Sequence, residues 1–270
     1  MFGAIVGDII GSRWEFNPTN DYHFELFSQH NGFTDDSICS LAIAHALLQG
    51  STDYGAYLHA WCRNHPNPMG GYGGRFMQWV LSGDPQPYHS FGNGSAMRVS
   101  AIGWAFEDAD AVLREAEKSA ACSHNHPEGI KGAQAVALAI RDARLWKKDF
   151  KGTITPDVLR KEVLHRAVGL YCPNPEDFIL NLEEHKNCFD ETCQGTVPVA
   201  LWIVMHSKDF EDAVRKAVSL GADADTLGAI TGSIAEAIWG IPEWMKQKAM
   251  EYLTDEMKHV LLDFSEKYIC

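Results

Sequence analysis

The chain has 270 residues, of which 46% are hydrophobic, and its formal net charge at pH 7 is −13. This length fits one large domain or two small ones, and the apolar fraction is enough to bury a substantial core. The negative charge disfavours direct nucleic-acid binding, which needs clustered lysine and arginine, but small anionic ligands stay possible because backbone N–H groups and metal ions bind phosphate.

The first segment, MFGAIVGDIIGSRWEF, begins with a glycine-rich helical pattern. Gly3, Gly7 and Gly11 recur every four residues, which would let this helix pack closely against a neighbour. The segment lacks a basic n-region and reaches Asp8 too early for a signal peptide, and no stretch of the chain approaches the roughly 20 apolar residues that cross a bilayer. We expect Asp8 to be buried and hydrogen-bonded in a structural role, and Glu15 to point into a cleft.

Helical periodicity dominates the rest of the chain. Apolar residues recur at three- and four-residue steps over residues 38–48, 111–122, 130–146, 158–170, 199–205, 210–220, 227–239 and 257–264. Alternating strand patterns are nearly absent. The sequence therefore predicts an all-α fold of ten or more helices, in a single domain over residues 1–270.

Glycine, proline and asparagine concentrate over residues 63–95. Loops of this length in compact domains are often functional, and we expect Phe76, Met77 and Trp79 to anchor this one as a short helix. An interdomain linker is the alternative. The seven cysteines have scattered spacing without a C-x-x-C pair, which favours reduced thiols in a cytoplasmic protein, although Cys188 and Cys193 could be close in space.

Thr34-Asp35-Asp36-Ser37 precedes the helical segment 38–48. Capping is the conservative interpretation, with Thr34 or Asp35 as the N-cap and the second acid favoured by the helix dipole. Capping and the helix dipole together can explain this motif when it is taken alone, so a further role for the adjacent carboxylates depends on whether the chain carries a second motif of the same kind.

A second acidic motif, GADADT at residues 221–226, stands before the segment 227–239. Asp223 and Asp225 alternate as if an extended turn aims both at one point, and Thr226 follows. Carboxylate and hydroxyl oxygens are the hard ligands that Mg²⁺, Mn²⁺ and Ca²⁺ prefer. Four carboxylates brought together would repel one another, and a two-metal centre would relieve that repulsion and leave positions for substrate or water.

Two further motifs carry polar or glycine-rich loops. In FGNGSAMR, residues 91–98, Gly92 and Gly94 permit close backbone approach before a helix and could cradle an anion, but a plain turn with a cap explains them equally well. In CSHNHPEG, residues 122–129, the spacing of Cys122, His124 and His126 does not match structural zinc sites. We expect that loop to line a polar pocket or to form a solvated turn.

In this order the motifs resemble those of the ADP-ribosylglycohydrolase family, which includes the dinitrogen-reductase-activating glycohydrolase and the vertebrate ADP-ribosyl-acceptor hydrolases. The matching segments, spread over residues 3–242, are GAIVGDIIGSRWEF, FTDDS, GNGSAMR, SHNHPEGIKGA, TVPVALW and GADADTLGAITGSIAEAIWGIP. The resemblance implies a compact all-α fold with two Mg²⁺ or Mn²⁺ ions at the base of a cleft.

Carried over by position, the resemblance implies roles for individual residues. One metal ion would be bound by Thr34, Asp35 and Asp36, and the second by Asp223, Asp225 and Thr226, with Asp225 placed to bridge. The loop that binds the diphosphate and the nearby ribose matches Gly92, Asn93, Gly94 and Ser95, and His124 matches a histidine that faces the ADP-ribose. Glu15 matches an acidic residue that approaches the metals or the scissile ribose.

Two positions depart from the family pattern. Ser37 stands where many members have threonine, but it keeps the hydroxyl. Ala222 stands where a second glycine is usual, and an alanine there would be strained if the position needs a positive φ.

The implied activity is hydrolysis of the glycosidic bond at C1″ of an ADP-ribosyl group on a protein or small molecule, with free ADP-ribose as product. Asp35 is the first candidate for the acid/base or water-orienting role and Glu15 the second. The alternatives are a non-catalytic crystallin-like structural or ADP-ribose-binding protein of the same fold, which would be expected to lose metal ligands, and a metal-dependent phosphohydrolase. The acceptor stays open among arginine, serine, a nucleobase or another group, with selectivity expected in residues 17–33, 63–91 and 187–195.

Overall fold

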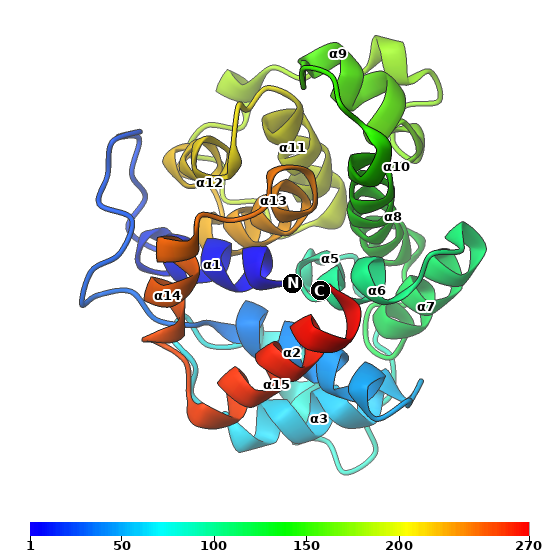
Figure 1. Cartoon of the computed structure of the whole chain (residues 1–270). Helices are drawn as coiled ribbons and strands as arrows, with labels where there is room; N and C mark the ends of the chain where they lie inside the picture. Colours follow the sequence, from blue (N-terminus) through cyan, green and yellow to red (C-terminus); the bar gives the residue numbers. More distant parts are fainter. Residues whose placement is uncertain (270) are drawn as a thin grey trace.

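The computed structural model describes residues 1–269, which form helices joined by loops (Figure 1). The α-helices are α1 (Phe2–Gly11), α2 (Asp35–Leu48), α3 (Tyr54–Asn64), α4 (Gly74–Leu81), α5 (Gly94–Met97), α6 (Ser100–Ala105), α7 (Ala109–Ala121), α8 (Pro127–Asp149), α9 (Pro156–Val158), α10 (His165–Gly169), α11 (Cys193–Met205), α12 (Phe210–Ser219), α13 (Ala224–Trp239), α14 (Glu243–Met250) and α15 (Asp255–Tyr268). Short turns are η1 (Ser12–Trp14), η2 (Leu159–Val163), η3 (Pro175–Asp177) and η4 (Leu182–Glu184). These residues contain no strand, only an isolated bridge between Gly92 and Thr192, so the all-α prediction is confirmed.

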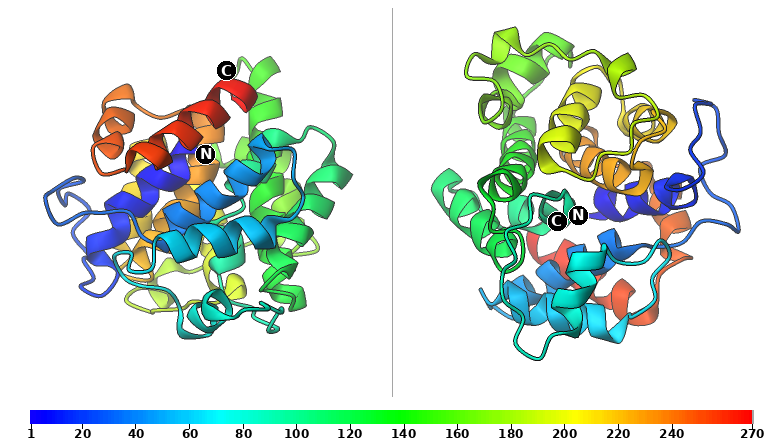
Figure 2. Two further views of the ribbon diagram at one scale, coloured as in Figure 1. Left: turned by 90° about the horizontal axis from the view of Figure 1, so that it is seen from below. Right: turned by 180° about the vertical axis from the view of Figure 1, so that it is seen from behind.

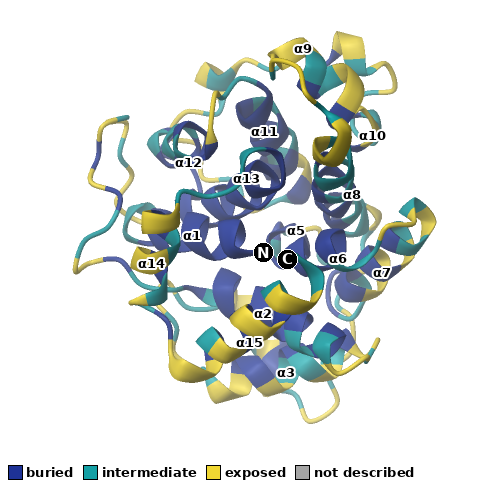
Figure 3. Ribbon diagram, viewed as in Figure 1, coloured by how far each residue is buried: buried dark blue, intermediate teal, exposed yellow. Residues whose placement is uncertain are grey.

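The helices α1 and α13 form the centre of the molecule. Both are buried along almost their whole length and appear dark blue in Figure 3, whereas α9, α14 and α15 carry exposed residues. Their backbones meet at glycines: a Cβ on Gly7 would lie 2.0 Å from the carbonyl oxygen of Gly228, and one on Gly3 would lie 2.1 Å from that of Gly232. The close packing predicted from the glycine repeat is therefore confirmed.

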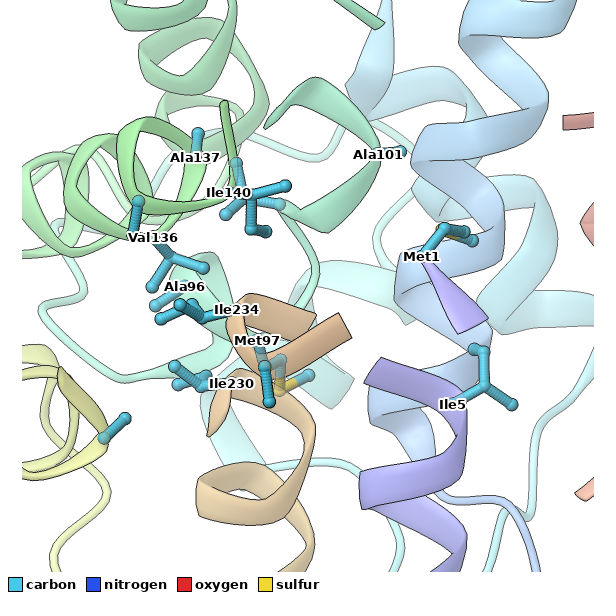
Figure 4. Packing of buried hydrophobic residues seen from close by; sticks show 14 of the residues in the cluster. Met1, Ile5, Ala96, Met97, Ala101, Val136, Ala137, Ile140, Ile230 and Ile234 are labelled. Carbon is cyan, nitrogen blue, oxygen red and sulfur yellow. The ribbon is translucent and has the colours of Figure 1, made fainter. Parts of the chain in front are cut away.

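The other helices surround this pair. On one side α2 packs against α1, α3 and α15, and on the other α8, α11 and α12 contact α13 (Figures 1 and 2). The short helix α5 contacts both α13 and α8. Figure 4 shows the apolar residues at that junction, which include Ala96, Met97, Val136, Ala137, Ile140, Ile230 and Ile234. The loop between η1 and α2 (blue in Figures 1 and 2) extends outward from the helices.

One helix prediction was wrong in its continuity. The apolar periodicity over 158–170 suggested one helix, but the chain forms α9, then a π-helical turn in η2, then α10. The N–H of Leu164 donates to the carbonyl oxygen of Leu159 at 2.7 Å, which widens the turn. Leu159, Val163 and Leu164 are all buried through this adjustment, so the apolar pattern reported burial correctly but not the type of helix.

Two smaller predictions can be compared with the structure. The expected short helix in the loop 63–95 is α4, and Phe76 and Trp79 anchor it in the core. Cys188 and Cys193 are free thiols, as are Cys39, Cys62, Cys122 and Cys172, and Cys270 lies outside the described residues.

Across residues 1–269, none of the helices combines the length and apolar character required to span a membrane.

Candidate active site

A cavity of about 370 Å³ lies where the starts of α2, α5 and α13 meet. Its walls come from distant parts of the chain: the segment after α1, the loop before α4, the loop before α5, the α7–α8 junction and the α13 start. The acidic residues that line it are Glu15, Asp35, Glu191, Asp223 and Asp225, and the basic or neutral polar ones include Arg75, Arg98, Asn93, Thr226 and His124. The cavity therefore joins a strongly acidic region to glycine-rich backbone and two arginines.

Three of the acidic side chains converge on one point. One carboxylate oxygen from each of Glu15, Asp223 and Asp225 lies within 4.8 Å of the others. Glu15 Oε2, Asp36 Oδ1 and Asp225 Oδ1 are buried oxygens without a hydrogen-bond partner. Buried polar atoms are nearly always partnered, so these three oxygens are suited to bind a hard cation.

The pKa values of the clustered carboxyl groups are raised by burial and by repulsion between their negative charges. Burial, and then the neighbouring Asp225, raises the pKa of Glu15 to about 9. Burial raises the pKa of Asp223 to about 7, with Glu15 adding to the shift. The pKa values of Asp35, Asp36 and Asp225 are also raised, first by burial and then by neighbouring aspartates. When no cation is bound, the carboxyl groups therefore keep their protons to a higher pH than usual.

The α2 start is held by α1. Thr34 is the N-cap, and its Oγ1 accepts a hydrogen bond from the backbone N–H of Asp36 at 3.2 Å. Asp8 accepts from the N–H and hydroxyl of Thr34 at 3.1 and 2.7 Å, from the N–H of Ser37 at 3.1 Å, and from the Ser37 hydroxyl. Asp8 is thus buried and hydrogen-bonded as predicted, and the capping interpretation holds for Thr34. Asp35 is left to face the cavity.

The α13 start is held from two sides. Asp223 occupies the N-cap position and accepts a hydrogen bond from Asn93 Nδ2 at 2.7 Å. Thr226 donates its hydroxyl to Asp36 Oδ2 at 3.2 Å, which joins the two acidic motifs directly. Gly221 takes the positive φ, 72°, and Ala222 does not, so the alanine that departs from the family pattern carries no backbone strain.

The predicted residues differ in how they meet the cavity. Asp35, Asp223, Asp225, Thr226, Glu15, Gly92, Asn93, Gly94 and His124 line it. Thr34 and Asp36 lie beneath its floor, fully or almost fully buried. The side chain of Ser95 does not line the cavity, because it is buried and donates to the carbonyl oxygen of Gly129 at 2.7 Å. Its hydroxyl braces the loop from below, since the first turn of α5 faces the core.

Sequence reasoning missed several lining residues. Gly70 has a φ of 76°, and a Cβ there would lie 2.4 Å from Glu15 Oε2, so this glycine makes room for the carboxylate. The Gly70-Gly71 pair in the long loop was the available signal. Glu191 lies within the segment 187–195 expected to control selectivity, but without an individual role. Arg98 ends the GNGSAMR motif and is completely buried, which no sequence pattern indicates.

His124 lines the cavity next to the loop before α5. Its Nδ1 is 2.8 Å from Ser123 Oγ, and its Nε2 would be 3.1 Å from a Cβ built on Gly94. Burial, followed by the nearby charges of Arg98 and Arg75, lowers its pKa well below the usual range. The imidazole is therefore neutral at physiological pH.

Comparisons with known proteins agree with this architecture. Residues 1–268 match the family model described as ADP-ribosylglycohydrolase. The chain is 26% identical over 300 aligned positions to the ADP-ribosylarginine hydrolase Tri1 of Pseudomonas putida, covering 97% of this chain and 76% of the relative. It is 24% identical to the ADP-ribosylhydrolase ARH3 of Danio rerio, covering 89% and 82%. A solved structure named ADP-ribosylglycohydrolase-related protein complex superposes with a TM-score of 0.67 at 26% identity, over 98% of this chain and 94% of that one.

Proposed function

Because this chain belongs to the ADP-ribosylglycohydrolase family, we propose that it hydrolyses the glycosidic bond between C1″ of an ADP-ribosyl group and its acceptor, releasing ADP-ribose. The observation that carries the proposal is the convergence of Glu15, Asp223 and Asp225 in a cavity large enough for a ligand. A structural protein would gain nothing from this arrangement, because buried carboxylates without partners destabilise the fold.

The donor set fits two Mg²⁺ or Mn²⁺ ions. One would be held by Asp223, Asp225 and Glu15, and the other by Asp35 and Asp36 with the hydroxyls of Thr34 and Thr226, Asp225 being shared. The unpartnered oxygens of Glu15, Asp36 and Asp225 support this assignment, since each is buried and carries a free lone pair. Bound ions of this kind supply Lewis-acid polarisation and a template for the ribose hydroxyl groups.

The remaining residues of the site hold these carboxylates in place. Asp8 accepts four hydrogen bonds from Thr34 and Ser37, which fixes the backbone on both sides of Asp35 and Asp36. Asn93 orients Asp223, and Thr226 orients Asp36. Positioning of this kind is a large part of what an enzyme contributes, because the reacting groups are already aligned when substrate arrives.

Proton transfer and charge stabilisation are assigned to Asp35 first and Glu15 second. Both line the cavity, and burial and neighbouring acids raise the pKa of each. A raised pKa is the direction that lets a carboxyl exchange a proton near neutral pH. Glycosidic cleavage passes through an oxocarbenium-like state, and a nearby ionised carboxylate stabilises that positive charge.

For the acceptor we propose arginine. The exposed residues Glu191 and Phe16 line the cavity, and the exposed ring of Phe189 packs beside Phe16 with its centroid 6.0 Å away. A guanidinium is attracted to carboxylates and stacks on aromatic faces, whereas a serine hydroxyl gains little from either. The similarity to a protein named ADP-ribosylarginine hydrolase supports the same choice.

The test is release of free ADP-ribose from arginine-linked and serine-linked ADP-ribosyl peptides, with Mg²⁺, with Mn²⁺ and with a chelator. Asp35→Asn and Asp225→Asn should each lower turnover by about 100-fold or more, the loss typical of a general acid–base or metal-positioning group. The matched control is Asp263→Asn, an exposed position on α15. Failure to cleave either peptide, or unchanged turnover in both site variants, would contradict the proposed chemistry. Faster cleavage of the serine-linked peptide would contradict the acceptor alone.

A further inference from the structure

A buried chain of three side chains runs from the core to the cavity. Arg98, which is 0% exposed, places Nη2 at 2.9 Å from Ser123 Oγ and at 2.9 Å from the carbonyl oxygen of Ser119. Ser123, also 0% exposed, places the same Oγ at 2.8 Å from His124 Nδ1. His124 is 5% exposed and lines the cavity. The chemistry proposed for the carboxylates does not use these three hydrogen-bonded residues.

The direction of the hydrogen bonds follows from what each group can donate. A guanidinium only donates, so Ser123 Oγ accepts from Arg98. The hydroxyl then has one hydrogen to place. His124 Nδ1, at 2.8 Å, is a stronger acceptor for it than the neighbouring sulfur of Cys122, because sulfur accepts hydrogen bonds only weakly. If Nδ1 carried a hydrogen instead, two donors would point at Ser123 Oγ, and the hydroxyl hydrogen would be left with only the weak sulfur acceptor of Cys122.

We propose that Arg98, acting through Ser123, fixes His124 as the neutral tautomer with its hydrogen on Nε2, and so presents an N–H donor to a ligand oxygen above the Gly92–Gly94 loop. Arg98 is thereby a positioning residue, not an anion ligand. The identity of the ligand oxygen, one belonging to ADP-ribose, rests on the proposed function; the tautomer does not.

The surroundings of the ring agree with this orientation. Nε2 faces the loop backbone, since a Cβ built on Gly94 or Gly92 would lie 3.1 or 3.5 Å from it. Tyr88 and Phe76 pack against the ring with centroids 5.6 and 6.3 Å away, which restricts its rotation. Burial, and after it the charges of Arg98 and Arg75, lowers the pKa of the His124 imidazole, so the donor stays uncharged. The neutral Nε2–H group can donate a hydrogen bond to a phosphate or hydroxyl oxygen and does not remove a proton from the ligand.

The first experiment reads the tautomer directly in the whole protein without ligand. Nitrogen chemical shifts of isotope-labelled histidine, measured at about pH 8 where a histidine of ordinary pKa is neutral, should place Nδ1 of His124 in the unprotonated range and Nε2 in the protonated range. Ser123→Ala should remove that preference, whereas Ser119→Ala should keep it, because the Ser119 hydroxyl bonds only within its own helix, to Ala116. A hydrogen on Nδ1 in the unmodified protein would overturn the inference.

The second experiment measures ADP-ribose affinity by calorimetry. His124→Gln, whose amide nitrogen can reach the Nε2 position, should bind more tightly than His124→Asn, whose amide lies nearer Nδ1. Ser123→Ala should weaken binding by about 5- to 10-fold, the loss of one hydrogen bond, and Ser119→Ala should not. Tighter binding by the asparagine variant would overturn the inference. If the unmodified protein does not bind ADP-ribose at all, the proposed function fails, while the nitrogen shifts still decide the tautomer.

Discussion

The carboxylate of Asp8 accepts the hydroxyl of Thr34 at 2.7 Å and the backbone N–H of the same residue at 3.1 Å. A completely buried side chain of α1 thus caps α2 from outside, in addition to the cap that Thr34 itself provides. Because Asp35 and Asp36 are the next two residues, the geometry of the acidic cavity depends on a residue that does not line it.

Asp8→Asn should therefore destabilise the fold and weaken metal binding together. The asparagine amide has only one acceptor oxygen, and its N–H₂ group would face the N–H and O–H donors of Thr34 and Ser37. We therefore expect the free energy of unfolding to fall by about 2 to 3 kcal/mol. Urea unfolding and Mn²⁺ titration measure the two effects. Asp263→Asn, the same change at an exposed position, should alter neither. Normal Mn²⁺ affinity in the Asp8 variant would show that the α2 start is held by other contacts.

Gly7→Ala should separate the two central helices. A methyl group there would lie 2.0 Å from the carbonyl oxygen of Gly228, a rigid backbone atom. Overpacking of this kind costs about 3 kcal/mol at the upper end of its usual range, and thermal unfolding should report a correspondingly lower Tm. Gly83→Ala is the control, because Gly83 is exposed and a Cβ added there would meet nothing within 4 Å. Equal stability of the two variants would contradict the close packing of α1 on α13.

The stability of the cation-free protein should fall as pH rises. Asp223 has a raised pKa of about 7 and Glu15 one of about 9, against ordinary values of 3.8 and 4.5. Between the ordinary and raised values the folded protein binds more protons than the unfolded chain, so unfolding becomes easier with increasing pH. A divalent cation would replace those protons.

The measurement is Tm with a chelator and with Mn²⁺, at about pH 5.5 and about pH 8. The lower value lies between the ordinary and raised pKa values of both groups, and the higher one lies above the raised pKa of Asp223 but below that of Glu15. The increase in Tm on adding Mn²⁺ should be larger at the higher pH, where Asp223 is already ionised and the metal competes with fewer protons. Taking the difference at each pH cancels the titration of groups far from the cavity. A cation effect that is equal at both pH values would argue against binding by these carboxyls.

Gly70 and Gly71 offer a matched pair. Both have positive φ, 76° and 86°, so alanine at either should cost about 1 to 2 kcal/mol of backbone strain. Only at Gly70 would the new methyl meet Glu15, at 2.4 Å from Oε2, whereas nothing lies within 4 Å at Gly71. We expect similar unfolding midpoints for the two variants but lower hydrolysis and weaker Mn²⁺ binding for Gly70→Ala alone. Similar activity in both would remove Glu15 from the proposed site.

The rim should control the acceptor. Glu191→Gln and Phe16→Ala should each raise KM for an arginine-linked substrate by about 2- to 5-fold, the value of an exposed charge or cation–π contact. Cleavage of a serine-linked substrate should not change. Glu266→Gln, an exposed change on α15, serves as control. If both substrates lose activity equally, the rim supports the fold of the loops and does not select a cationic acceptor.

The sequence by itself determined the residue types and the local structure. The three- and four-residue periodicity predicted an all-α fold because a helix buries one face whatever surrounds it. The glycine repeat in residues 3–11 predicted close helix packing, since a missing Cβ is visible in the sequence. Asp35 and Asp36, and Asp223 and Asp225, could be identified as candidates because each pair exceeds what one helix start needs.

Only the tertiary structure decided which side chains meet. The sequence separation between Asp36 and Thr226 is 190 residues, and their hydrogen bond exists because α2 and α13 both pack on α1. Asp8 turns toward α2, Ser95 turns into the core, and Arg98 is buried against Ser123, and no local pattern distinguishes these orientations from their opposites. The periodicity of apolar residues shows which face of a single helix is buried. A site is formed by several segments, and their separation in the sequence does not determine their distance in space.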